Sequence, residues 1–160
     1  DIIASRRGDE QRIQLRAVPV GTITYAAMFS EVRDAQMASA TLYGNLHRAW
    51  GVARWQFEAT LTAAAAADTT LLEGDFALLP FEVGGLVLLW ASPYQWEVQS
   101  LAAVADGELE LATSLRNLWP AGTKVLPMVI GRLSNDQPYV WESLKVGSQL
   151  LTFDIDGFKP

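Results

Sequence analysis

The segment from Phe81 to Leu133 most restricts what this chain can fold into, because it carries a near-continuous series of strand signals. Residues 86–91, LVLLWA, form an apolar run that is typical of a strand buried on both faces and too short for a typical helix. Asp106-Gly107 is a tight hairpin signal, and a last apolar run covers Val125–Ile130. Four short strands in about fifty residues predict a small, strongly curved β-barrel rather than a flat sheet.

Two of these strands alternate with a period of two, which predicts which side chains enter the core. In the first, Trp96, Val98 and Val104 are expected to face inward, with Glu97 and Gln99 on the other face. The strand after the hairpin has the same pattern. It is expected to place Leu109 and Leu111 inward, and Glu108 and Glu110 outward.

Short motifs along the chain carry a resemblance to a known family. In order they are GDEQRIQLR from Gly8, Trp50-Gly51 with Arg54-Trp55 behind it, GGLVLLW from Gly84, WEV from Trp96, LEL from Leu109 and WPAGTKVLP from Trp119. The chain resembles minor tail proteins of long-tailed bacteriophages, the distal-tail or baseplate components. These motifs serve packing and turns rather than chemistry, so the resemblance assigns no catalytic residue.

The resemblance implies a structural role in the virion, at the tail tip or baseplate, after assembly in the host cytoplasm. Such proteins form rings or hub layers that join the tail tube to tip and fibre proteins. The implied partners are therefore further copies of the chain and other tail proteins: the tube, tape measure, hub and fibres. DNA would pass nearby without being bound specifically.

Composition narrows the classes of function. The chain has 160 residues and no cysteine, so it can build a core without disulfides, and thiolate metal sites are excluded. Twelve Lys and Arg against eighteen Asp and Glu give a net charge of −6, which argues against a nucleic-acid-binding surface. No apolar stretch approaches the roughly 20 residues that span a bilayer, so no membrane anchoring is expected. The chain begins at Asp1 rather than methionine, which raises the hypothesis of a longer parent protein.

The N-terminal third predicts a β-β-α-β unit. Alternation over Arg12–Ala17 and Thr22–Phe29 indicates a hairpin, with Ile23, Tyr25 and Phe29 opposite Thr22, Thr24 and Met28. Ser30 is the expected N-cap of a helix whose apolar stripe runs from Val32 to Ala49, with Gly51 at its C-terminal end. Arg54–Leu61 then returns to period two as a strand.

The C-terminal end matches this first unit better than the barrel. Strands are expected over Tyr139–Val146 and Leu150–Ile155, joined around Gly147-Ser148. We therefore predict an α+β, β-rich fold: a β-sheet or sandwich packed by one helix and interrupted by an inserted small barrel of the SH3/OB type. The domains would be 1–61 plus 134–160, a tail-tube-like unit by the resemblance; 62–83, a weakly structured connector that includes the alanine run 63–67; and 84–133, the barrel.

Side chains for catalysis or metal binding are scarce. His47 is the only histidine, so a pair of histidine ligands or a relay of two histidines is impossible, and a surface or structural role is expected. Asp154 and Asp156 share a strand face, but the further ligands of a calcium loop are missing. No hydrolase elbow, P-loop or dinucleotide motif occurs. We expect no cofactor, metal site or catalytic residue.

The aromatic side chains divide into core and interface candidates. Trp55, Trp90 and Trp96 lie within apolar alternations and are expected in the core. The candidates for an interface between subunits, which stand beside turn signals, are Trp119, Tyr139 and Trp141.

Two classes of function stay open at this point. The preferred interpretation is a non-enzymatic structural subunit of a phage tail tip. The alternative is a glycan-binding module or glycosidase-type enzyme for the cell envelope, associated with the tail and using carboxylates such as Glu97, Glu108 and Glu142. A carboxylate pair about 5–10 Å apart in a cleft would favour the enzyme.

Overall fold

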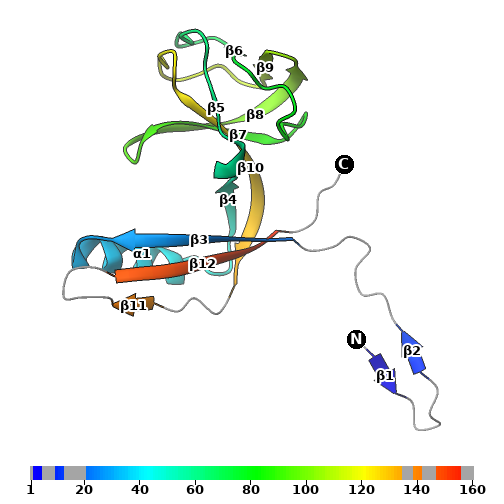
Figure 1. Ribbon diagram of the computed structural model, residues 1–160, viewed down its shortest axis with the longest axis vertical. Coiled ribbons are helices and arrows are strands. Elements are labelled where there is room, and N and C mark those ends of the chain that lie inside the picture. The colour runs from blue at the N-terminus through cyan, green and yellow to red at the C-terminus, as the bar shows by residue number, and fades with distance from the viewer. Residues whose placement is uncertain (1, 5–9, 13–20, 135–138, 142–146, 156–160) are drawn as a thin grey trace. The chain divides into compact units, whose positions relative to one another are not determined.

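The computed structural model describes residues 2–4, 10–12, 21–134, 139–141 and 147–155. This part of the chain is mostly antiparallel β-strand with a single α-helix, which confirms the predicted α+β, β-rich class (Figure 1). The chain divides into two compact units, one made of Asp1–Ala49 with Gly131–Pro160 and the other of Trp50–Ile130. Among the described residues, no helix has the length and apolar character needed to cross a membrane.

The first unit is built on a long antiparallel ribbon. Strands β3 (Gly21–Phe29) and β12 (Gly147–Ile155) pair along their whole length, from Gly21 opposite Ile155 to Phe29 opposite Gly147. On its other edge, β12 pairs with β11 (Tyr139–Trp141) and with the end of β10 (Lys124–Leu133). The C-terminal strand therefore joins the first sheet, as predicted. Gly147 and Ser148 lie within β12 rather than in a turn, because they pair with β3.

The two faces of the ribbon follow the predicted alternation. Ile23, Tyr25 and Phe29 are half-buried, whereas Thr24 and Met28 are exposed. Tyr25 meets Phe153 of β12 edge to face, with ring centroids 6.2 Å apart. Aromatic and branched side chains thus gather on one side of the ribbon.

Helix α1 (Val32–Gly44) follows β3 and is shorter than predicted. Its N-cap is Glu31 rather than Ser30. At the other end, the Asn45 backbone N–H donates to Leu42 O at 3.1 Å and its side-chain amide donates to Thr41 O at 2.8 Å. The predicted continuation to Ala49 is wrong, because these bonds close the helix and Ala49–Ala53 pairs with β10 as strand β4.

Most of the first strand of the predicted N-terminal hairpin lies outside the described residues. Strand β1 (Ile2–Ala4) pairs with β2 (Glu10–Arg12), and residues 13–20 lie outside the described part of the chain. Where β3 is described, its partner is β12.

The second unit is a closed barrel. Its strands neighbour one another in the order β5, β10, β7, β8, β9, β6. They comprise β5 (Ala59–Thr60), β6 (Leu71–Glu73), β7 (Leu86–Ser92), β8 (Gln95–Ala105) and β9 (Glu108–Leu111), together with β10. A bridge between Leu61 and Gly74 closes the ring, and the Thr62 N–H donates to Glu73 O at 2.9 Å. Closure joins β5 to β6, the two end strands that an open sheet in this order would leave as free edges.

Closure depends on residues that the sequence assigns to a connector. A Cβ at Gly74 would lie 2.8 Å from Thr60 O and 2.5 Å from the Phe76 ring, so only glycine lets the two segments approach here. The ring of Phe76 in turn meets Phe81 edge to face at 5.5 Å. The barrel therefore begins well before residue 84, and the predicted boundaries at 61 and 84 differ from those of the compact units.

The buried core of the barrel comes from every one of its strands. Its apolar residues are Ala59, Leu61, Ala65, Leu72, Phe76, Phe81, Val87, Leu89, Leu101, Leu109, Leu111, Leu115, Trp119 and Val125. Leu109 and Leu111 point inward after the Asp106-Gly107 hairpin, as predicted, and Gly107 has the positive φ of 86° that the turn requires. Val87 to Leu89 of β7 are all buried, which confirms a strand covered on both faces.

Two sequence-based assignments in this unit are wrong. Residues 54–61 form a 3-10 turn, η1 (Trp55–Phe57), followed by β5, because the Phe57 N–H bonds back to Arg54 O at 2.9 Å; Trp55 is therefore partly exposed. In β8 the faces are reversed. Trp96 is 55% exposed, whereas Glu97 and Gln99 are buried.

Candidate functional site

The reversed face of β8 creates a buried polar site inside the barrel wall. Glu97 Oε1 accepts hydrogen bonds from the Gln99 side-chain amide at 2.8 Å and from the Arg116 backbone N–H at 2.9 Å. Its Oε2 accepts from the Trp119 indole N–H at 3.1 Å and from the Asn117 amide at 3.4 Å. Four donors therefore converge on one carboxylate, and three of them belong to residues 116–119.

These contacts determine the ionisation of Glu97. Burial by itself raises the pKa of a carboxyl group, but the bonds from Arg116, Gln99, Trp119 and Asn117 outweigh it, and the pKa of Glu97 is lowered. The side chain is thus a carboxylate at neutral pH. It is unsuited to act as a general acid, which needs a raised pKa.

Gln99 continues the same network along β8. Its side-chain amide donates to Ser114 O at 3.3 Å as well as to Glu97, and its oxygen accepts from the Thr113 hydroxyl. Residues 113–117, which we call the tethered loop, are therefore fastened to the inward side chains of β8. A loop held at both ends by partly buried hydrogen bonds is more rigid than its lack of regular structure indicates.

A groove lies between β8 and the tethered loop. It has a volume of about 810 Å³. Its lining consists of Leu86, Trp96, Glu97, Val98, Gln99, Ser100, Thr113, Ser114, Arg116 and Asn117. Five of these are consecutive residues of β8, so the groove follows the strand.

The carboxylates considered for catalysis do not form a pair in this groove. Glu97 is the sole acidic side chain among its described lining residues, and its oxygens are occupied by four donors. Glu108 is exposed on β9, and Glu142 lies outside the described residues. Among the described residues, the groove therefore lacks the second carboxylate that a glycosidase needs.

The three aromatic interface candidates have different outcomes. Trp119 is 0% exposed and donates to Glu97, so its predicted role as a surface anchor is wrong: the indole fills the barrel core instead. Tyr139 and Trp141 lie on β11, whose backbone pairs with β12, but their side chains are outside the described part of the structure. For these two residues, the interface role stays a prediction.

The remaining chemical candidates are not brought together in the part of the chain that the structure describes. His47 is exposed in the turn after α1. Asp154 is exposed on β12, and Asp156 lies outside the described residues. Among described residues, no group of three or more His, Asp or Glu side chains could hold a metal ion.

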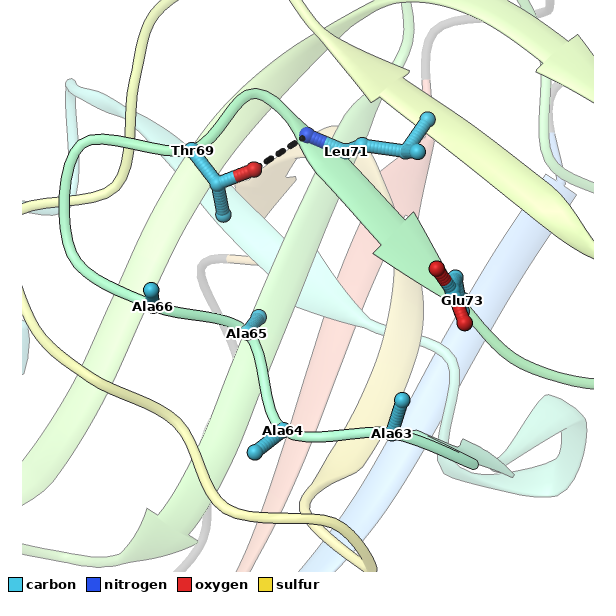
Figure 2. Close-up of a pocket in the computed structure, with 7 residues that line it drawn as sticks. All are labelled: Ala63, Ala64, Ala65, Ala66, Thr69, Leu71 and Glu73. Carbon is cyan, nitrogen blue, oxygen red and sulfur yellow. Dashed lines mark hydrogen bonds between the residues drawn. The ribbon is translucent and has the colours of Figure 1, made fainter.

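A second, smaller hollow is lined by the alanine run. Figure 2 shows Ala63 to Ala66 along one side and Thr69, Leu71 and Glu73 along the other. The Leu71 N–H donates to the Thr69 hydroxyl at 3.2 Å, while Ala65 pairs with Trp119 through two backbone bonds of 2.8 Å. Ala65 of the run thus belongs to the barrel core, and the methyl groups of the run give the hollow of about 210 Å³ little to recognise a ligand with.

The first unit has an exposed apolar stripe that the sequence pattern did not single out. On the outer face of the β3–β12 ribbon, Met28 is 71% exposed and Leu150 is 49% exposed. Leu150 pairs with Ala26, and Met28 pairs with Ser148, so these side chains are neighbours on one face. We call Ala26, Met28 and Leu150 the ribbon stripe. Its signal in the sequence is an apolar residue at an outward position of each strand.

Comparison with known proteins adds no family. Neither the scan against protein-family models nor the search of curated proteins finds a match to this chain.

Proposed function

We propose that this chain is a structural subunit of the tail tip or baseplate of a long-tailed bacteriophage, where it forms a ring or hub layer between the tail tube and the tip and fibre proteins. The sequence motifs that resemble distal-tail proteins support the proposal. So does the division of the chain into a sheet-and-helix unit and a barrel unit.

The observation that carries the proposal is the ribbon stripe. Met28 and Leu150 are exposed on strands that pair in register over nine residue pairs, so the stripe lies on an extended and regular surface. Exposed apolar residues that gather on one regular face are typical of a surface that another chain covers. In a ring, that chain is a further copy of the same protein.

The charge of the protein suits such a position. A net charge of −6 repels a phosphate backbone, so a ring around the DNA channel would not retain the DNA during ejection. A glycosidase has less support, because the groove beside β8 has one carboxylate among its described lining residues.

Localisation on the particle tests the proposal. Antibodies raised against the purified chain should label the distal end of the tail in immunoelectron microscopy of phage particles whose genome encodes the chain. Labelling confined to the capsid, or a chain that is missing from purified particles by mass spectrometry, would overturn the assignment.

A further inference from the structure

The strand that lines the groove has an unpaired edge. Leu101 exchanges hydrogen bonds with the segment before β7: its N–H donates to Gly85 O at 2.9 Å, and its C=O accepts from the Gly84 N–H at 2.8 Å. On the opposite edge of β8, the Ser100 C=O accepts from the Ala112 N–H at 2.8 Å. These bonds show which edge of β8 the backbone groups of Ser100 and Leu101 face.

Alternation along the strand then orients the residues before Ser100. The N–H and C=O groups of Val98 and Trp96 face the same edge as those of Ser100, away from β7. Strand β9 covers that edge only as far as Leu101 opposite Leu111. In the described chain, no hydrogen bond satisfies the backbone groups of Val98 and Trp96 on this edge.

The tethered loop explains why β9 stops there. After Ala112 the chain turns to bond the inward side chains, with Thr113 and Ser114 on Gln99 and the Arg116 N–H on Glu97. The loop therefore runs beside the edge without pairing with it. The groove is the space that it leaves, and the open edge along it runs from Trp96 to Val98, the length of about three strand residues or about 10 Å.

The charges in the groove favour one kind of occupant. The carboxylate of Glu97 keeps its negative charge, but its two oxygens are already occupied by four hydrogen-bond donors of the chain itself. The guanidinium of Arg116 has no acidic partner among the described residues, because only its backbone N–H is bonded. An acidic group in the occupant would form a charge-assisted hydrogen bond with this guanidinium.

We propose that this groove binds an extended, acidic peptide segment of another protein by β-strand addition. The peptide backbone pairs with Trp96 and Val98, along the part of the edge that β9 does not cover. An acidic side chain of the peptide pairs with Arg116. The tethered loop stands beside the edge as a wall, so a single strand fits whereas the sheet edge of a second folded barrel does not. The site rests on the barrel alone and does not depend on the tail-tip proposal.

The test selects a ligand from an unbiased source. A library of random nine-residue peptides in mRNA display is selected against the full chain and counter-selected against Arg116→Glu. Enriched peptides should share an acidic position flanked by β-branched residues. A synthetic copy of an enriched peptide should bind Arg116→Glu at least tenfold more weakly than the wild type. It should bind Arg48→Glu, an equal change of charge outside the groove, less than twofold more weakly.

Amide exchange supplies the readout that is specific to strand addition. Bound peptide should slow exchange of the Trp96 and Val98 amides at least tenfold, while those of Glu97 and Gln99, which already face β7, change little. Circular dichroism of the Arg116 variant checks that the fold is retained, and Arg116→Gln repeats the test without reversing the charge.

Three outcomes would overturn the proposal. The first is selection without a shared acidic, β-branched pattern. The second is an enriched peptide that leaves the Trp96 and Val98 amides unprotected. The third is protection of those amides at high protein concentration without peptide, which would assign the edge to a second copy. A glycan site would be indicated instead if a neutral oligosaccharide such as chitotetraose binds and Trp96→Ala abolishes the binding.

Discussion

Glu97 holds the tethered loop in place, so its charge has a measurable structural role. In Glu97→Gln, the new amide group must face a donor such as the Trp119 indole, and one charge-assisted acceptor is lost. We expect the free energy of unfolding to fall by about 1.5–3 kcal/mol, the range for hydrogen bonds to charged groups. Urea unfolding measures it. Glu108→Gln, the same change at an exposed site on β9, should stay within about 0.5 kcal/mol, and equal losses in both variants would contradict the role assigned to Glu97.

The same carboxylate makes stability depend on pH. Its pKa in the folded protein is lowered from the ordinary value of 4.5 by the four hydrogen bonds that outweigh burial. The contribution of the charged form is therefore fully present above pH 4.5 and is lost as the pH falls through the lowered folded pKa. The stability difference between the wild type and Glu97→Gln should shrink as urea unfolding is repeated from about pH 7 to about pH 3. A constant difference would mean that Glu97 does not titrate with a lowered pKa.

Truncation should destabilise the protein much more at Trp119 than at Trp96. Trp119 is 0% exposed and bonded to Glu97, so Trp119→Ala should cost about 3–5 kcal/mol as a large-to-small core change. Trp96 is 55% exposed beside the groove, and Trp96→Ala should cost about 1 kcal/mol or less. Thermal unfolding measures the loss of stability in each variant, and a larger loss for Trp96→Ala than for Trp119→Ala would contradict the prediction.

The sequence pattern predicts the reverse, with Trp96 in the core and Trp119 at an interface, and the difference has a physical reason. An alternating strand shows two faces, and polarity normally tells which one is buried. In β8 the acid and the amide are the inward residues, because the donors that satisfy them come from residues 113–119, distant in sequence. No local pattern reports such partners. The buried site and its groove could therefore not be predicted, whereas β9, whose inward residues are leucines, was.

At the scale of elements, helix α1 begins without a side-chain cap. Glu31 has the extended backbone of an N-cap residue, yet its longer side chain makes no capping bond. Glu31→Asp keeps the charge and shortens the side chain to one that caps well, so it should stabilise the first unit by about 0.5–1 kcal/mol. Thermal unfolding followed by helix ellipticity measures it. Glu31→Gln, which does not shorten the side chain, is the control, and an equal gain there would exclude capping as the cause.

Local signals located most elements but not all of their ends. The strands β3, β7, β9 and β10 follow from apolar runs and alternation, and the helix follows from its apolar stripe. The helix ends early because the side chain of Asn45 competes for a backbone carbonyl. The closure of the barrel by residues 61–74 was missed, because a bridge at Gly74 has no periodicity to mark it.

At the scale of the whole chain, the return of the C-terminal strand to the first sheet was predictable. The alternation of β12 matches that of β3, and the two pair along nine positions. The exact limits of the inserted unit were not predictable from the sequence, because they depend on which of residues 50–83 join the barrel core. Phe76 and Leu72 belong to that core, although they lie in a stretch without a clear strand pattern.

Assembly through the ribbon stripe is the prediction that bears on the whole molecule. Met28→Asp with Leu150→Asp places charge on two exposed positions of paired strands, so the fold should be retained while an apolar contact between subunits is lost. Native mass spectrometry should show a ring-sized oligomer for the wild type, alone or mixed with neighbouring tail proteins, and the monomer for the double variant. Val83→Asp, an equally exposed apolar position in the barrel unit, is the control and should assemble normally. If the double variant assembles as the wild type does, the ribbon stripe is not the subunit contact; if the wild type is a monomer in every mixture, the ring itself must be given up.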